Sequence, residues 1–213
     1  MLKQMGFILM LVSSMVMSAK ECTIDAIKKD GGQVWEIPVV CQSLDLKWDK
    51  IGYKGAKELA AALLKNETLT YLDLSYNDIG AEGAKELAAA LKDNNTLTEL
   101  NLYSNNIGDD GVKELAATLL ENETLTSLNL GGNYIGDEGA KELAAALLVN
   151  DTLTEIYLHA NDISAAGAEA LAAALRINDS LKILKVFSYR TIDVRRDYFD
   201  DLPRVKSKAL KIL

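Results

Sequence analysis

Residues 66–93 read NETLTYLDLSYNDIGAEGAKELAAALKD, and this stretch decides the fold because the chain repeats it every 28 residues. Its opening, Asn-Glu-Thr-Leu-Thr, returns at Asn122, and close variants begin at Asn94, Asn150 and Asn178. A period of about 20 to 50 residues is typical of a solenoid, in which each unit buries its apolar face by stacking on its neighbours. The repeat therefore predicts how the protein is built without identifying a partner.

The two halves of the repeat have different hydrophobic periods. Around Leu72 and Leu74 apolar and polar residues alternate, which predicts a short strand with both leucines turned inward. Its outward residues are then Tyr71, Asp73 and Ser75. Leu87 and Leu91 lie four apart among alanines, which is a helical spacing. One repeat is thus predicted to be a strand, a turn and a helix.

Residues at the element boundaries predict how each helix begins and ends. Glycine and serine suit helix N-caps, which are expected at Gly80, Gly108, Gly136 and Ser164. The free amides and the helix dipole favour negative charge in the first turn of a helix. Such charge is expected from Asp109, Asp110, Asp137 and Glu138. Asparagine tolerates the left-handed conformation that ends helices, so C-caps are expected at Asn66, Asn94, Asn122, Asn150 and Asn178.

The repeat register extends in both directions from these copies. Residues 38–65 form a degenerate first copy, and Leu181, Leu184 and Val186 mark a last strand. This count predicts six parallel strands and five helices. Strands stack about 4.8 Å apart whereas helices need roughly 10 Å, so the array must curve. The expected fold is an α/β solenoid, a horseshoe segment with parallel strands on the concave face and helices on the convex face.

The pattern LTYLDLSYNDIGAEGAKELAAAL resembles the ribonuclease-inhibitor type of leucine-rich repeat over roughly residues 38–187. Members of that type include the repeat regions of NOD-like receptors and Ran GTPase-activating proteins. The leucines match it, as do glycines at 55, 83, 111, 139 and 167. The resemblance implies that an asparagine side chain bonds backbone groups in the strand-to-helix loop, a role expected for Asn77, Asn105, Asn133 and Asn161. It implies no single function, since the fold serves inhibitors, receptors and regulators alike.

The first residues lie outside the repeat and have the pattern of a secretory signal. Lys3 provides a positive start, the stretch 5–17 is almost entirely apolar, and Val16 and Ser18 are small enough for cleavage before Ala19. An apolar run this short does not suit a membrane span. We therefore expect a secreted or periplasmic protein whose mature chain has no stable membrane span. The alternative is an amphipathic or buried N-terminal cap on a cytoplasmic protein.

These boundaries divide the chain into four segments. Residues 1–18 are the expected signal peptide, 19–37 an N-terminal cap, 38–187 the leucine-rich repeat array and 188–213 a C-terminal cap. The two cysteines, Cys22 and Cys41, lie ahead of the first full repeat. In an exported chain they are expected to form a disulfide that contributes about 3 kcal/mol by restricting the unfolded chain. The alternative is that Cys41 only fills an inward leucine position.

The charge distribution of the chain and the missing enzyme motifs exclude several classes of function. The formal net charge is -8, and residues 182–213 carry nine Lys or Arg against four Asp, which leaves the repeats strongly acidic. Nucleic acid is not expected as a partner, because it needs a continuous basic surface. The basic end is interpreted as a solvated cap, with an anionic partner or membrane as the alternative. Enzyme and metal-site motifs are missing, so no catalytic residue, cofactor or metal ligand is predicted.

The strongest functional signal is the set of outward residues on the six predicted strands. Large aromatic side chains recur there, and tyrosine and tryptophan supply interface hot spots. The predicted partner-binding residues are Asp45, Lys47, Trp48, Tyr71, Asp73, Tyr76, Glu99, Asn101, Tyr103, Asn129, Glu155, Tyr157, His159, Lys185 and Phe187. The alternative is that these side chains only cover the backbone of the sheet.

The predicted function is a non-catalytic module that binds a protein or peptide ligand on its concave face. The face is only about 25 to 30 Å wide, so we expect modest affinity or a peptide-like ligand. The alternative is an intracellular regulator of a GTPase or another enzyme that acts by direct binding.

Overall fold

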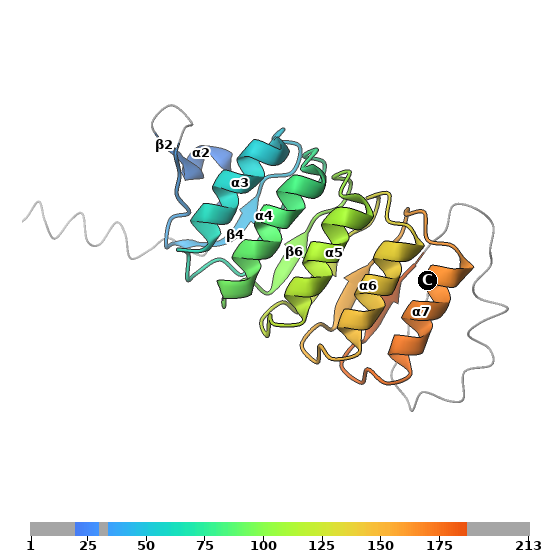
Figure 1. Cartoon of the computed structure of the whole chain (residues 1–213). Coiled ribbons are helices and arrows are strands. Elements are labelled where there is room, and N and C mark those ends of the chain that lie inside the picture. The colour runs from blue at the N-terminus through green and yellow to red at the C-terminus, as the bar shows by residue number, and fades with distance from the viewer. Residues whose placement is uncertain (1–19, 30–33, 187–213) are drawn as a thin grey trace, which may run out of the picture.

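The computed structural model describes residues 20–29 and 34–186 (Figure 1). The predicted signal peptide, the predicted C-terminal cap and Phe187 lie outside the described residues. Statements about the structure below concern the described residues.

The predicted solenoid is confirmed. Helices lie side by side in one layer and strands form a second layer behind them (Figure 1). The helices are α3 (Gly52–Leu63), α4 (Gly80–Asp93), α5 (Gly108–Leu119), α6 (Asp137–Leu147) and α7 (Ala165–Leu175). The strands of the repeats are β4 (Cys41–Asp45), β5 (Tyr71–Asp73), β6 (Glu99–Asn101), β7 (Ser127–Asn129), β8 (Glu155–Tyr157) and β9 (Ile183–Lys185). All of them pair in parallel with their sequence neighbours.

The segment before the repeats adds a seventh strand that the sequence analysis did not predict. Strand β1 (Lys20–Cys22) pairs in parallel with β4, so the sheet order is β1-β4-β5-β6-β7-β8-β9. A short helix, α2 (Ile24–Ile27), and the antiparallel pair β2 (Lys28–Lys29) and β3 (Val34–Trp35) follow it. Cys22 and Cys41 form a disulfide between β1 and β4, with their Cα atoms 5.8 Å apart. The edge of the first repeat is therefore covered by a covalently attached strand.

The core is built from positions that recur in every repeat. Leu44, Leu72, Leu100, Leu128, Ile156 and Leu184 stand in register on six successive strands, and each is at most 3% exposed. Small residues let neighbouring helices approach each other closely. A Cβ added to Gly83 would lie 2.4 Å from the Cγ2 of Ile79 and 3.1 Å from the Cβ of Ala56. The recurring glycine is therefore a packing requirement between neighbouring repeats.

The asparagines of the strand-to-helix loops form a buried ladder, as the resemblance implied. The Nδ2 of Asn105 donates to the carbonyls of Leu74 at 2.8 Å and Leu102 at 3.1 Å. Its Oδ1 accepts from the backbone amide of Asn77 at 3.0 Å. Asn77, Asn133 and Asn161 repeat this pattern. Each side chain joins one loop to the next, so buried backbone groups that have no partner within their own repeat are satisfied.

The predicted left-handed C-caps are wrong. Asn94 has φ -82° and ψ 117°, and Asn66, Asn122, Asn150 and Asn178 also lack positive φ. Each asparagine instead bonds to the preceding repeat. The Nδ2 of Asn122 donates to the carbonyl of Leu91 at 2.7 Å, while its Oδ1 accepts from the amide of Leu125 at 2.8 Å. The side chain thus satisfies the open end of the neighbouring helix, a demand that one repeat considered alone does not reveal.

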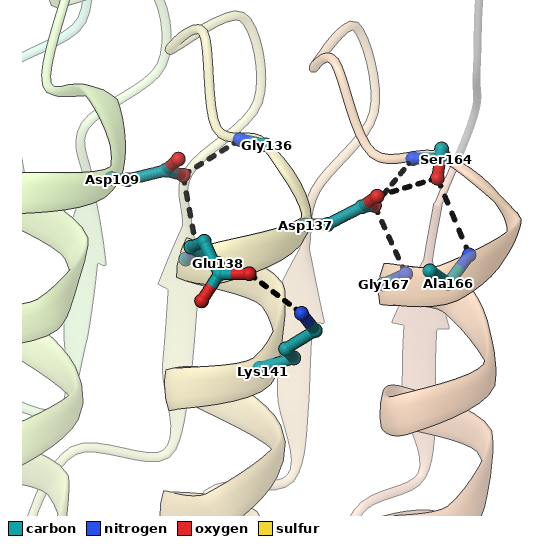
Figure 2. A network of polar contacts seen from close by, with 9 residues as sticks. Asp109, Gly136, Asp137, Glu138, Lys141, Ser164, Ala166 and Gly167 are labelled. Carbon is teal, nitrogen blue, oxygen red and sulfur yellow. Dashed lines mark hydrogen bonds and ion pairs between the residues drawn. The ribbon is translucent and has the colours of Figure 1, made fainter.

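Negative charge lies in the first turns of the helices, as predicted, but it caps the next helix and not its own. The carboxylate of Asp109 accepts from the amides of Gly136 at 2.7 Å and Gly139 at 3.0 Å, at the start of the next helix (Figure 2). Asp137 does the same for Ser164 at 2.8 Å and Gly167 at 2.9 Å (Figure 2). Because the helices are parallel and begin in register, a carboxylate in one first turn lies beside the free amides of its neighbour.

The other boundary residues divide into two groups. Gly136 and Ser164 occupy the N-cap positions as predicted, and the Ser164 hydroxyl accepts from the amide of Ala166. Gly80 and Gly108 instead begin their helices, with φ of +67° and +62°.

The two remaining acidic residues of the first turns lie at the surface. Asp110 is exposed, and Glu138 forms an ion pair with Lys141 at 2.6 Å (Figure 2).

Candidate protein-binding face

The strand register brings the predicted site residues together on one face of the sheet. Opposite the buried ladder, Ser43, Tyr71, Glu99, Ser127, Glu155 and Ile183 form a first column. Asp45, Asp73, Asn101, Asn129, Tyr157 and Lys185 form a second column. Lys47, Trp48, Tyr76, Tyr103 and His159 follow the carboxyl ends of the strands. We use the term concave face for these two columns and the residues after them.

Four rings make a continuous series along the carboxyl ends of the strands. Trp48 stacks on Tyr76 with ring centroids 3.8 Å apart and an interplanar angle of 11°. The edge of Tyr76 meets Tyr103 at 5.2 Å, and Tyr103 stacks on His159 at 5.3 Å. We call Trp48, Tyr76, Tyr103 and His159 the aromatic row. Ring contacts of this kind contribute about 0.5 to 1.5 kcal/mol each beyond area burial.

The aromatic row depends on Gly131, which the sequence analysis did not select. Tyr103 follows β6 and His159 follows β8, so two strand spacings, roughly 9.6 Å, separate their backbones. A Cβ at Gly131 would lie 2.7 Å from the Cε1 of His159 and 2.8 Å from the Cδ2 of Tyr103. The two rings therefore meet only because residue 131 has no side chain. The signal in the sequence is a glycine at a repeat position where the other copies have side chains, namely Lys47, Ser75, Tyr103 and His159.

Two members of the aromatic row lie in a backbone conformation that bulky residues rarely adopt. Trp48 has φ 67° and Tyr76 has φ 59°, and the matching loop positions are Ser104, Gly132 and Ala160, all with positive φ. The loop therefore demands the left-handed conformation in every repeat. A non-glycine residue there costs on the order of 1 kcal/mol or more. Trp48 is also 62% exposed, so core packing does not compensate for this cost.

The second column has a structural role that the sequence analysis missed. The side-chain oxygens of Asp45, Asp73, Asn101 and Asn129 accept from the backbone amide two residues further on, at 2.8 to 3.1 Å. These contacts turn the chain at the end of each strand. Ser75 was predicted to face outward, but it is only 2% exposed. The end of β5 does not explain this burial, because Tyr103 and His159 hold the same repeat position and belong to the aromatic row.

Carboxylates and tyrosines pair on the two columns. The Tyr157 hydroxyl donates to Glu155 at 2.7 Å, and the Tyr71 hydroxyl donates to Asp73 at 3.4 Å. The hydrogen bond to Glu155, followed by burial, raises the pKa of Tyr157 to about 12. Burial, followed by the charge of Asp73, raises the pKa of Tyr71 to about 12. Both hydroxyls stay protonated at neutral pH and act as donors to an acidic surface.

Positive charge lies at the two ends of the concave face. The Nζ of Lys47 lies 5.4 Å from the ring centroid of Tyr76, and the Nζ of Lys185 lies 5.1 Å from that of Tyr157. Burial, followed by the charge of Lys185, lowers the pKa of His159. This lowered pKa favours the neutral imidazole in the contact with Tyr103. Among the described residues, no group of three or more His, Cys, Asp or Glu is arranged to hold a metal ion.

Comparisons with known proteins agree with this architecture. A model of the TMOD/LMOD leucine-rich domain matches residues 84–160, and a leucine-rich repeat model matches residues 65–88 and 149–172. The chain therefore contains leucine-rich repeats. None of the curated proteins compared with the chain matches it.

Two solved structures are similar to the chain. One, described as leiomodin-1 actin-binding site 2, has 25% identity and a TM-score of 0.57, over 61% of this chain and 78% of that one. The other is the tropomodulin C-terminal domain of Caenorhabditis elegans, with 16% identity and a TM-score of 0.54, over 73% of this chain and 90% of that one. The second likeness is one of fold alone.

These comparisons correct the predicted location. The expected secreted or periplasmic protein is contradicted by the match to the TMOD/LMOD leucine-rich domain and by the likeness to the leiomodin-1 structure, which favours the cytoplasmic alternative. None of the helices in the described ranges combines the length and hydrophobicity that a membrane span requires.

Proposed function

We propose that the chain is a non-catalytic protein-binding module that uses its concave face. The aromatic row carries this proposal. Its rings lie on an open sheet face, and Trp48 and Tyr76 are held at backbone positions that disfavour bulky residues. Residues kept at such positions despite their cost are candidates for function. Tyrosine and tryptophan provide large contact area at low entropic cost, which makes them frequent binding hot spots.

Actin is the first partner to test, because one matched structure is described as an actin-binding site. Direct regulation of a GTPase or another enzyme is the alternative use of the same face.

The type of repeat is proposed on separate grounds. The 28-residue spacing of the loop asparagines and the α-helices on the convex side support the ribonuclease-inhibitor type of repeat for this array.

The test compares the two faces of the array. Residues 20–186 are added to filamentous actin for sedimentation and to labelled monomeric actin for anisotropy. Tyr103→Ala and Tyr157→Ala are each expected to weaken binding about tenfold or more. Lys113→Ala and Lys141→Ala on helices α5 and α6 serve as convex controls and are expected to leave binding unchanged.

Melting curves for all four variants separate binding from folding. Loss of affinity with an unchanged melting temperature supports the concave face. Equal losses from both faces, or losses that follow stability, would mean that these tyrosines are structural. If neither form of actin binds, the same four variants are used with proteins captured by the wild-type array.

A further inference from the structure

The four central strands, β5 to β8, carry carboxylates but no basic side chain of their own in the two columns, and among the described residues the one ammonium that reaches them is that of Lys185, over the ring of Tyr157. In the two columns these strands carry Asp73, Glu99 and Glu155, and neither column has a lysine or arginine between β5 and β8. The lysines of the concave face, Lys47 and Lys185, lie near Tyr76 and Tyr157 at its two ends. The centre of the face is therefore complementary to a cation.

Glu99 is the carboxylate with the most open surroundings. It is exposed, and no hydrogen bond to its side chain is found among the described residues. Its negative charge contributes to the raised pKa of Tyr71 on the adjacent strand β5 and of Tyr157 on β8, two strands away on the other side. Asp73, by contrast, already accepts from Asn101 at 2.9 Å and from the Ser75 amide at 2.8 Å. Glu99 is thus available to a ligand in a way that Asp73 is not.

Ser127 stands between the two glutamates in the first column. The register pairs Glu99 with Ser127 and Ser127 with Glu155. Two strand spacings, roughly 9.6 Å, therefore separate the glutamate backbones, with a short side chain between them. The Glu155 carboxylate accepts from the Tyr157 hydroxyl at 2.7 Å through one of its two oxygens. A planar guanidinium that donates to Glu99 on one side and to Glu155 on the other, through hydrogen bonds of about 2.9 Å, matches this spacing.

Neighbouring groups favour arginine over lysine. A guanidinium offers donors in two directions and packs flat on aromatic rings, whereas an ammonium is a compact and strongly hydrated charge. Tyr157 lies next to Glu155 and already has a lysine over its ring, so a ring face here accepts a cation. The aromatic row runs beside the columns and offers apolar contact to the chain that carries the arginine.

We propose that the concave face binds an arginine-bearing segment of its protein partner, with one guanidinium held between Glu99 and Glu155 above Ser127. This inference rests on the proposed function, because it names the chemistry of the partner at the same face. It predicts that arginine is preferred over lysine and that the preference requires both glutamates.

The experiment uses three acetylated and amidated peptides, each with two arginines, two lysines or two neutral citrullines in one glycine-serine-proline background. Binding to the ¹⁵N-labelled full chain is followed by amide chemical shifts at roughly millimolar peptide. The arginine peptide is expected to shift the amides of Glu99, Ser127 and Glu155, the lysine peptide to bind several-fold more weakly, and the citrulline peptide not to bind. Glu99→Gln with Glu155→Gln is expected to reduce arginine-peptide affinity at least tenfold.

Two further variants make the result decisive. Ser127→Arg places a guanidinium of the protein itself at the proposed position and is expected to abolish peptide binding. Glu58→Gln with Glu142→Gln removes two exposed charges from helices α3 and α6, and is expected to leave binding unchanged. Equal shifts from the arginine and lysine peptides, equal effects of the two glutamate pairs, or no shift with any peptide would each overturn the inference.

Failure of this inference differs from failure of the proposed function. If Tyr103→Ala weakens binding of the intact partner while Glu99→Gln with Glu155→Gln does not, the concave face binds but without an arginine at this position. If neither change affects the intact partner, the concave face is not the binding surface.

Discussion

Replacement of Asn122 tests the central structural finding, that helix ends are satisfied by the neighbouring repeat. The side chain is 4% exposed. Its Nδ2 donates to the Leu91 carbonyl at 2.7 Å, and its Oδ1 accepts from the amides of Leu125 at 2.8 Å and Thr124 at 3.1 Å. Asn122→Ala leaves at least one buried carbonyl and one buried amide without a partner. Each costs about 1 to 3 kcal/mol, so we expect a loss of about 2 to 6 kcal/mol.

The substitution of glycine separates the two explanations of this asparagine. A left-handed C-cap would tolerate Asn122→Gly, because glycine adopts that conformation freely. An inter-repeat hydrogen bond requires Asn122→Gly to be at least as destabilising as Asn122→Ala, since both remove the amide group. Asn122→Asp keeps an acceptor for Leu125 but loses the donor to Leu91, and places a charge beside that carbonyl.

The assay is urea unfolding of residues 20–186, followed by circular dichroism at fixed protein concentration. Asn95→Ala is the matched control, because Asn95 is an exposed asparagine with one long side-chain contact, 3.4 Å to the Asp93 carbonyl. We expect it to change stability by less than about 0.5 kcal/mol. A glycine variant as stable as wild type, or an alanine variant no worse than the Asn95 control, would refute the reasoning.

Three further substitutions test other parts of the structure. Leu100→Ala removes a 3% exposed member of the buried ladder and is expected to cost about 2 to 5 kcal/mol in urea unfolding; a loss below about 1 kcal/mol would contradict the register. Gly131→Ala is expected to separate Tyr103 from His159, which is measured as a change in the ring-current shifts of both side chains; unchanged shifts would mean that the rings do not need a glycine there. Asp137→Asn tests the inter-repeat cap through pH, because hydrogen bonds, first of all from Ser164, lower the pKa of Asp137. A lowered folded-state pKa stabilises the protein above the unfolded value, about 3.9, and this contribution is lost as the pH falls through the folded-state value. The stability difference between wild type and Asp137→Asn should therefore shrink as the pH falls below about 4, and a constant difference would exclude a role for the charge.

The sequence predicted those features that depend on one repeat and its exact copies. Alternation around Leu72 and the spacing of Leu87 and Leu91 are local patterns, and strict repetition turns them into a ladder. The errors at the helix C-caps and at the acidic first turns have one physical cause. Asn122 and Asp109 were interpreted against their own helix, yet their partners lie in the preceding or the next repeat. In a solenoid the nearest open helix end belongs to a neighbour.

The candidate site was predictable in its composition and not in its contacts. The outward columns follow from register, so the tyrosines and carboxylates of the concave face were identified. The contact between Tyr103 and His159 across Gly131 depends on side-chain directions that register does not define. The strand-end role of Asp73 likewise depends on where β5 stops, and strand ends are the least predictable part of an element.

Fold and function occupy different positions of the same repeat. Inward leucines and loop asparagines recur in almost every copy, because each must match the copy beside it, and a change at one disturbs both neighbours. Outward positions other than the Asp and Asn of the second column have no such recurring partner, so they are free to differ. Trp48, Gly131 and His159 are departures from the repeat, and all three belong to or permit the aromatic row. They lie along one row of contacting rings that runs from β4 to β8, and we propose that a shared ligand, and not independent drift of exposed residues, accounts for them.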